Sequence, residues 1–246
     1  MLVLEGCRES QISLVLLPAR FLGPVFVLTQ LAGVAAGAQF TSSDPPGSAQ
    51  TRPVSINSGR DLAGYFMDAS GNYHGFLRLA NGTITTFDYA PKQGCCTFAT
   101  GINAADQIVG NYYGPNNIQY DFLREPDGSI TTIDLNTPAT PIPGQTALSG
   151  INASGTVAGT YYLNGGATGF VRTHDGTITT FQVPGAYATV PTSINNAADT
   201  AGYFNGPTGQ PGFIRTAEGT FQTFGVQGQA WLDQPVALND AGTAVV

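Results

Sequence analysis

Short apolar runs follow one another along most of this chain, separated by turns rich in Gly, Asn and Asp. The runs are too short to favour helices, and they are rich in Val, Tyr, Phe and Thr, which are typical of strands. Several strands at regular spacing, with a turn signal between each pair, indicate a protein without helices. The pattern therefore predicts an all-β fold.

These runs belong to a repeat that occurs four times and begins a fifth. Each copy contains an apolar residue followed by Asn, at spacings of 43 to 49 residues: Asn57, Asn103, Asn152, Asn195 and Asn239. A period in the forties indicates a propeller or a solenoid. We expect these asparagines to have a structural role, because they recur in every copy.

Each copy divides into four segments. The first ends at the apolar-Asn pair, and the second contains a Gly followed closely by Tyr65, Tyr112, Tyr161 or Tyr203. The third contains Phe-apolar-Arg, and the fourth reads TITTF or a close variant after a hairpin dipeptide such as Asp127-Gly128. Four strands per unit of this length predict a β-propeller blade. A solenoid is the alternative, but parallel β-helices repeat over shorter periods.

A tight turn is expected after each Asn. We assign its left-handed residue to a Gly or Asp close behind that Asn, because Gly adopts positive φ freely and Asp tolerates it. The residues assigned in this way are Gly59, Asp106, Gly155, Asp199 and Gly242.

The domain boundaries follow from composition. Residues 1–38 include the apolar run 21–38, which ends in Ala36-Gly37-Ala38, and this pattern predicts a secretory signal peptide, with an uncleaved membrane anchor as the alternative. Residues 39–52 are rich in Pro and Ser and predict a linker. Residues 53–246 form the repeat domain, with units at about 54–99, 100–148, 149–191 and 192–235 and a partial fifth at 236–246. Either four units close the ring, or the ring is open or incomplete with five.

The motifs resemble a known family. The run I-N-x-x-G-x-x-x-G-x-Y, followed by G-F-x-R, G-T-I-T-T-F and P-G-A, is similar to the HAF repeats of probable extracellular bacterial proteins. The naming triplet survives only at His74-Gly75-Phe76; the other units have Tyr120-Asp121-Phe122, Thr168-Gly169-Phe170 and Pro211-Gly212-Phe213. The resemblance implies secretion and a repeat scaffold, and it implies no defined activity.

Charge and composition narrow the possible partners. The net charge is −7, and two of the nine basic residues, Arg8 and Arg20, lie in the predicted leader. Nucleic acid is therefore an unsuitable partner, because phosphate binding requires a basic patch. Charged residues make up only 10% of the chain, so polar uncharged residues must cover the surface. Beyond the leader no apolar run could span a membrane.

The sequence contains no recognisable catalytic, cofactor or metal motif. The adjacent Cys95 and Cys96 could form a ring disulfide, pair with another chain or stay free, and their spacing does not suit a metal site. His74 and His174 fall in different segments of the repeat, and the spaced acidic residues of a calcium loop are missing. We therefore predict no cofactor and no metal, although two carboxylates brought together in space could still serve a glycosidase.

Four arginines occupy one position of the repeat: Arg78, Arg124, Arg172 and Arg215. They could line a channel and bind an anion such as a uronate or a sulfate. We favour a structural role, in which each guanidinium bridges backbone carbonyls or an Asp of the adjacent blade.

Binding is predicted at one end of the blades. The connections from strand two to strand three, and from strand four to the next blade, vary in length and lie at the same end. Their aromatic residues form the candidate binding face: Tyr73, Tyr89, Tyr120, Tyr187 and Trp231. We predict a secreted or extracellular, cell-surface or periplasmic protein without enzyme activity that binds a glycan or a surface protein. The alternatives are an extracellular polysaccharide hydrolase or lyase, and a purely structural matrix protein.

Overall fold

A computed structural model describes residues 3–5, 39–41, 43–89, 96–114, 118–133, 135, 146–163, 165–207, 209–225 and 237–245. The chain divides into two compact units, Met1–Ser43 and Asp44–Val246. In the first unit β1 (Val3–Glu5) pairs antiparallel with β2 (Gln39–Thr41). The predicted signal peptide otherwise lies outside the described residues.

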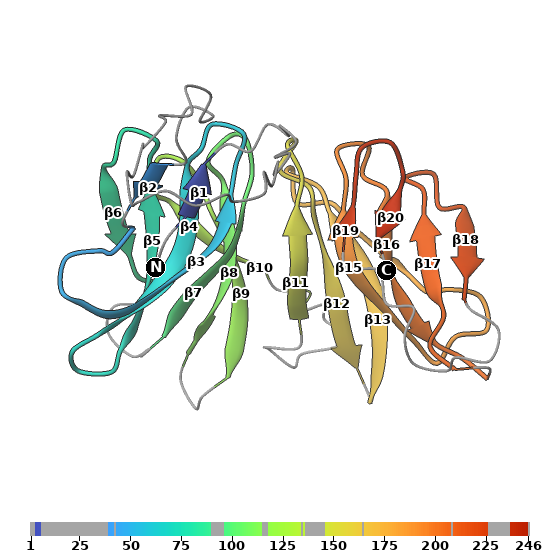
Figure 1. The fold of residues 1–246 in the computed structure, drawn as a ribbon. Helices are drawn as coiled ribbons and strands as arrows, with labels where there is room; N and C mark the ends of the chain where they lie inside the picture. Colours follow the sequence, from blue (N-terminus) through green and yellow to red (C-terminus); the bar gives the residue numbers. More distant parts are fainter. Residues whose placement is uncertain are drawn as a thin grey trace, which may run out of the picture. The chain divides into compact units, whose positions relative to one another are not determined.

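The second unit consists of four groups of four consecutive antiparallel strands, which we call blades one to four, followed by a strand pair (Figure 1). One parallel bridge, between Ala167 and Ala188, joins blades three and four into a single eight-stranded sheet. Blade one contains β3 (Ser48–Ile56), β4 (Leu62–Asp68), β5 (Tyr73–Arg78) and β6 (Ile84–Phe87). Blade two contains β7 (Thr97–Ile102), β8 (Ile108–Tyr113), β9 (Gln119–Arg124) and β10 (Ile130–Ile133). Blade three contains β11 (Thr146–Ile151), β12 (Val157–Leu163), β13 (Gly166–Arg172) and β14 (Ile178–Phe181). Blade four contains β15 (Ala188–Ile194), β16 (Thr200–Asn205), β17 (Gly212–Arg215) and β18 (Phe221–Phe224), and the final pair is β19 (Ala237–Leu238) and β20 (Ala244–Val245).

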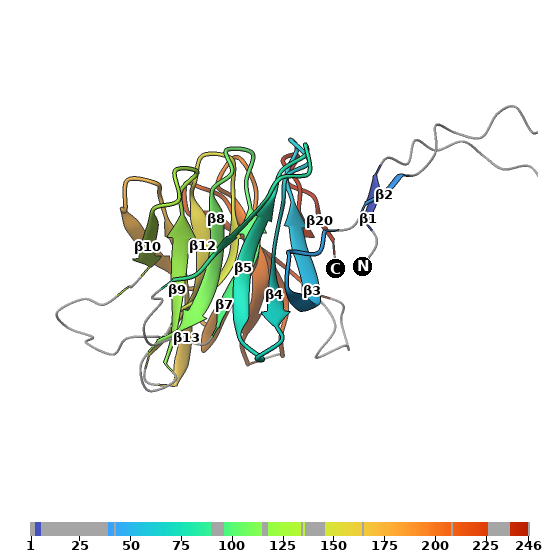
Figure 2. The ribbon, with the colours of Figure 1, turned by 90° about the vertical axis from the view of Figure 1, so that its left-hand side faces the viewer.

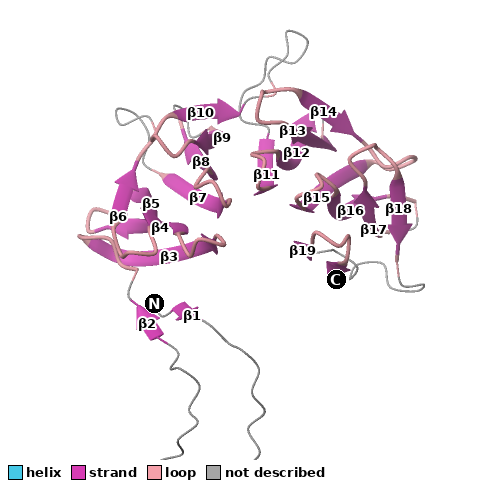
Figure 3. Cartoon of the chain, turned by 90° about the horizontal axis from the view of Figure 1, so that it is seen from above, coloured by secondary structure: helices cyan, strands magenta, loops and turns pink. Residues whose placement is uncertain are grey.

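The blades are arranged around a common axis, with the first strand of each innermost (Figure 3). Within every blade, sequence neighbours pair as neighbours, so the described part of this unit is all-β, as predicted. The turns that join strand one to strand two, and strand three to strand four, lie at one end of the blades, which we call the short-turn end (Figure 2). We call the opposite end the variable-loop end.

A buried Phe in each third strand forms the centre of each blade: Phe76, Phe122, Phe170 and Phe213. Each of these residues pairs with the Gly of the second strand, as Phe122 does with Gly110. A Cβ on Gly110 would lie 2.1 Å from the Phe98 carbonyl oxygen and 2.7 Å from the Phe122 ring. The glycine is therefore required by packing between adjacent strands.

The repeated tyrosines do not share one position. Counted from the central glycine, Tyr65 and Tyr203 come one residue later, whereas Tyr112 and Tyr161 come two residues later. Since successive side chains of a strand point to opposite faces, the two pairs face opposite sides of their blades.

The left-handed residue after each Asn stands three positions beyond it in all five units: Arg60, Asp106, Gly155, Ala198 and Gly242. The assignments to Gly59 and Asp199 were therefore wrong. The amide of this third residue donates to the Asn carbonyl, and that hydrogen bond fixes the position of the turn whatever residue occupies it.

The hairpins between strands three and four also differ from a two-residue turn. Only the glycine has positive φ, between 90° and 94°, at Gly82, Gly128, Gly176 and Gly219. In blade one, Leu79 and Thr83 close the loop and Gly82 donates to Leu79. This is a three-residue loop with a left-handed third residue.

The predicted linker is partly a strand, since β3 begins at Ser48, inside residues 39–52. Pro53 interrupts the register between β3 and β4, and Pro191 does the same between β15 and β16. Proline is tolerated at such irregularities. β15 has a second pairing partner only at Ala188, away from Pro191. The proline-rich composition therefore led to the prediction of a linker where the chain forms the first part of β3.

Candidate functional site

Aromatic side chains gather at the variable-loop end, between blades one and two. The ring of Phe98 lies 4.9 Å from that of Tyr65, 5.1 Å from that of Tyr73 and 6.2 Å from that of Tyr113, measured between centroids. All four side chains are partly exposed. An isolated bridge between Tyr73 and Cys96 connects the two blades here. The four rings, which we call the Phe98 cluster, form a continuous apolar surface with hydroxyl groups.

Three tyrosines form a second group, the Tyr112 cluster. Tyr112 is buried, and its ring stacks on Tyr120 at 5.3 Å and contacts Tyr89 at 4.2 Å. The Thr132 hydroxyl donates to the Tyr89 hydroxyl over 2.9 Å. Burial raises the pKa of Tyr112 to about 12, so this hydroxyl stays protonated at physiological pH.

His74 lies at the same end, between two carboxylates. Its Nδ1 is 2.9 Å from Asp88 Oδ1, its Nε2 is 3.3 Å from Asp68 Oδ2, and its ring stacks on Phe66 at 5.0 Å. Burial lowers the pKa of His74, but the hydrogen bonds and charges of Asp88 and Asp68 outweigh burial and raise it. Hydrogen bonds from Asn72, first from its backbone, hold the pKa of Asp68 at about 2. The group offers charged hydrogen-bonding atoms at the edge of an aromatic surface.

Three of the five predicted binding residues lie in these clusters: Tyr73 in the Phe98 cluster, and Tyr89 and Tyr120 in the Tyr112 cluster. Tyr187 lies apart, on the connection between blades three and four, and it is 67% exposed. Trp231 lies outside the described residues.

The repeated arginines have two kinds of partner. Arg78, Arg124 and Arg172 donate from Nη1 to the carbonyl of the following residue, over 3.2 to 3.5 Å. The guanidinium of Arg124 also lies 4.9 Å from the ring of Phe87, and that of Arg215 lies 4.6 Å from the ring of Phe181. Both rings belong to the preceding blade. For these two arginines the partner in the adjacent blade is a phenylalanine; the expected partners were backbone carbonyls or an aspartate of that blade.

The repeated asparagines connect successive blades at the short-turn end. Each Nδ2 donates to the carbonyl oxygen of the next Asn, over 3.1, 2.9, 3.1 and 3.2 Å along the series Asn57, Asn103, Asn152, Asn195 and Asn239. Each Oδ1 accepts the amide four residues later, which closes the turn of its own unit. We call this series the asparagine ladder.

A cavity of about 220 Å³ lies at the ladder, lined by turn residues of all five units, from Asn57 and Ser58 in the first to Leu238 and Asp240 in the last. Arginine is not among the described lining residues, so this cavity gives no support to an arginine-lined anion channel.

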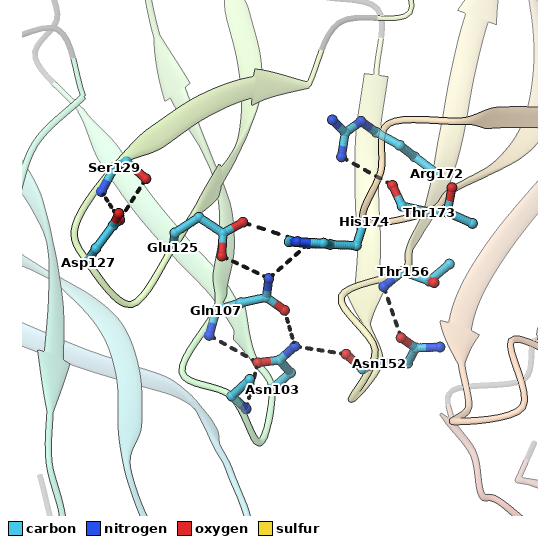
Figure 4. Close-up of polar contacts among 11 residues, drawn as sticks. Asn103, Gln107, Glu125, Asp127, Ser129, Asn152, Thr156, Arg172, Thr173 and His174 are labelled. Atoms are coloured by element: carbon cyan, nitrogen blue, oxygen red, sulfur yellow. Dashed lines mark hydrogen bonds and ion pairs between the residues drawn. The ribbon is translucent and has the colours of Figure 1, made fainter.

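A polar network connects blades two and three at the same end (Figure 4). Gln107 Nε2 donates to Glu125 Oε2 over 2.9 Å and lies 3.2 Å from His174 Nδ1, which is 3.9 Å from Glu125 Oε1. Asn103 donates to Gln107 over 2.7 Å, which couples the network to the ladder. A cavity of about 330 Å³ adjoins these residues and Ser154.

Asp121 is a buried carboxylate in β9, only 1% exposed. It accepts hydrogen bonds from the Thr146 hydroxyl and the Leu148 amide of blade three, while its Oδ2 has no partner. Burial raises the pKa of Asp121 to about 7, despite these two hydrogen bonds. The sequence carried a signal for this site, because Asp replaces the Gly of the HAF-like triplet in this unit alone.

Cys96 forms a disulfide, which excludes a free thiol at this position. Cys95 lies outside the described residues. Within the described ranges, no group of His, Cys, Asp and Glu is arranged to hold a metal ion. Across the same ranges, no helix is long and apolar enough to cross a membrane.

Comparisons with known proteins support the fold alone. No protein-family model matches the chain, and no curated protein sequence does. The crystal structure of TolB from Acinetobacter baumannii matches 78% of this chain at 13% identity with a TM-score of 0.53. Virginiamycin B lyase from Staphylococcus aureus matches 78% at 16% identity with a TM-score of 0.47. The chain spans 46% and 61% of the lengths of these two structures. The fold is therefore all-β and propeller-like.

Sequence reasoning missed Phe98, the centre of the first cluster. It lies directly beyond the cysteine pair, in a segment assigned to the end of the first repeat, whereas β7 begins at Thr97. The signal was available, since Asn103 follows the run Thr97 to Ile102 just as Asn57 follows β3.

Proposed function

We propose that this chain is a secreted, non-enzymatic, propeller-type repeat protein that binds a glycan through the variable-loop end of blades one and two. The HAF-like motifs and the predicted signal peptide support secretion. The disulfide at Cys96 also supports it, because disulfides persist mainly in oxidising compartments.

The observation that carries the proposal is the pair of aromatic clusters, with the His74 group beside them. Tyr and Phe rings present flat apolar faces with hydroxyl groups at their edges, and this combination suits the alternating C–H and O–H surfaces of a sugar ring. Asp68, His74 and Asp88 add acceptors and a donor at the rim. The surface requires two blades, so it depends on their packing.

The scaffold we propose is a ring of five units. Two observations support it: the asparagine ladder runs through five turns, and turns from the first and the last unit line one cavity.

Binding to a panel of immobilised polysaccharides tests the proposal. We expect retention of one class of polymer, and we expect Tyr73→Ala and Tyr120→Ala each to weaken binding at least tenfold, since hot-spot aromatics contribute about 2 kcal/mol or more. Tyr73→Phe is the matched control and should bind nearly as well, because it keeps the ring. If Tyr73→Ala and Tyr120→Ala folded and bound like the parent, this surface would not be the site.

The second candidate is a polysaccharide hydrolase or lyase at the opposite end. It is supported by the proximity of His174 to Glu125, beside a cavity of about 330 Å³. The same panel separates the candidates, because an enzyme releases soluble fragments and Glu125→Gln should abolish that release. Neither retention nor release would favour a structural protein.

A further inference from the structure

Blades three and four share one sheet, and a row of residues crosses it at the variable-loop end. Tyr162 of β12 pairs with Ala167 of β13, which forms the bridge to Ala188 of β15. Ala188 in turn pairs with Asn205 of β16, two residues beyond Tyr203. Directly paired residues, and residues two apart on one strand, point to the same face of a sheet. Tyr162 and Tyr203 therefore lie on one face, with Ala167 and Ala188 on the two strands between them.

The equivalent place between blades one and two holds the Phe98 cluster. A parallel bridge joins each pair of blades, at Tyr73 in one case and at Ala167 in the other, and both residues stand three positions before the buried Phe of their strand. A methyl group thus takes the place of the Tyr73 ring between blades three and four. The aromatic side chains there are Tyr162 and Tyr203, on the strands to either side of the bridge.

These two tyrosines are available to a ligand. Tyr162 is 46% exposed, and Tyr203 is partly exposed. Burial raises the pKa of Tyr162, and the nearby Tyr203 raises it further, so the two phenol groups lie close enough to interact. Tyr162 therefore stays protonated and uncharged at neutral pH.

Asn205 adds a hydrogen-bonding group on the same face. Its side chain is partly buried, and its Oδ1 has no hydrogen-bond partner among the residues that the structure describes. An amide oxygen without a donor is unfavourable in a folded protein. A ligand hydroxyl that reached this oxygen would supply the missing donor.

We propose that Tyr162, Tyr203 and Asn205 form a second glycan subsite, and that the ligand is a long, uncharged polysaccharide that contacts both pairs of blades. The second subsite rests on the proposed function, and it narrows the ligand to one class of glycan. Tyrosine rings suit the C–H faces of a sugar, and the amide oxygen suits its hydroxyl groups. Phenol and amide groups carry no charge, so this subsite fits neutral sugar units. Once one subsite holds the chain, contact with the other is intramolecular and therefore adds affinity.

Chain length tests the proposal. Fragments of the retained polysaccharide, graded from a disaccharide upward, are titrated against the full chain by calorimetry. We expect affinity to rise by about tenfold or more once a fragment is long enough to reach both subsites. Tyr162→Ala and Tyr203→Ala should each remove this rise and leave short fragments bound at the Phe98 cluster. Tyr73→Ala should weaken the binding of fragments of every length.

Two variants serve as controls. Tyr162→Phe keeps the ring and should keep the rise in affinity. Ile178→Ala removes an apolar side chain that is 40% exposed on β14, away from the subsite, and should also keep it. The test stays decisive if Tyr203→Ala folds poorly, because Tyr162 is more exposed and its replacement leaves the core intact.

The outcomes separate the second subsite from the proposed function. If long fragments bound Tyr162→Ala as tightly as the parent, the second subsite would be wrong, while the site on blades one and two would stand. If Tyr162→Ala weakened short and long fragments equally, the main site would lie on blades three and four, and a second subsite there would be wrong. Retention of no polymer would overturn both proposals. Binding that weakened steeply with added salt would contradict an uncharged ligand.

Discussion

Asp121 occupies a position that is glycine in the other three blades, and the residue opposite explains how it fits. Gly75 pairs with Phe87, and a Cβ on Gly75 would lie 2.5 Å from that ring. In blade two the residue opposite Asp121 is Ile133, which is smaller than Phe. The smaller Ile133 therefore leaves room for the Asp121 side chain, in the place where the Phe87 ring lies close to Gly75 in blade one.

We predict that this carboxyl group destabilises the protein at neutral pH. Its pKa is about 7 when folded against an ordinary value of 3.8, so the folded state holds a proton that the unfolded state loses between those values. The free energy of unfolding should therefore be highest in acid and fall as pH rises from about 4 to about 7. Asp121→Asn should remove this contribution and raise stability at pH 7 by up to a few kcal/mol, at about 1.4 kcal/mol per pKa unit.

Urea unfolding of the parent and of Asp121→Asn, at several values between pH 4 and pH 8, measures this difference. Asp127→Asn is a suitable control, because Asp127 is exposed in a hairpin turn. A difference between parent and Asp121→Asn that does not change with pH would contradict the prediction.

The strands and their order could be read from the sequence because each unit repeats the same local signals. The Phe of each third strand and the Gly of each hairpin between strands three and four stand where the repeat predicts them. The left-handed residue after each Asn was misplaced in two units, because Arg60 and Ala198 carry no preference for positive φ. Hydrogen bonds that backbone amides of the turn donate to the Asn carbonyl and to its Oδ1 impose that conformation, and residue type alone does not reveal it.

The fourth strand decides how the next blade's arginine is held. Arg124 and Arg215 are buried against Phe87 and Phe181 of the preceding blades. Arg172 follows blade two, whose fourth strand ends in Ile133, and it is more exposed. The aromatic end of one strand thus governs the burial of a cation in the next blade.

We therefore predict unequal costs for the same substitution at two equivalent positions. Arg124→Ala should lower the free energy of unfolding by about 1–2 kcal/mol, because it removes a largely desolvated cation–π contact. Arg172→Ala should cost less than about 0.5 kcal/mol, the range of ordinary surface changes. Chemical denaturation of both variants and the parent measures the difference, and equal losses would show that Phe87 contributes nothing to holding Arg124.

At the scale of the molecule, the repeat predicted blades around an axis, but not how they are joined. The sequence marks each Asn as structural, yet its contact with the next Asn spans 43 to 49 residues and depends on how the sheets pack. The Phe98 cluster also depends on how the sheets pack, because Tyr73 and Phe98 come into contact only where blades one and two are adjacent. Single-sequence patterns carry local information, and these contacts are not local.

We predict that the asparagine ladder contributes to the free energy of unfolding by connecting neighbouring blades. Asn152 is buried, its Oδ1 accepts the Thr156 amide, and its Nδ2 donates to Asn195 O over 3.1 Å. Asn152→Asp keeps the acceptor that closes the turn, but it places a carboxylate against a carbonyl in a buried site. It should cost about 3–5 kcal/mol at pH 7, the range for an uncompensated buried charge.

Asn239 provides the matched comparison. It is exposed, and its Oδ1 accepts the amides of Ala241 and Thr243 within its own turn. Asn239→Asp should therefore cost less than about 1 kcal/mol, because the charge stays in water. Acid should restore part of the stability lost in Asn152→Asp, since the buried carboxyl group has its pKa raised and regains a donor on protonation. Chemical denaturation of both variants at pH 7 and pH 4 measures their free energies of unfolding. Similar losses of stability at the two positions would mean that the ladder does not couple the blades.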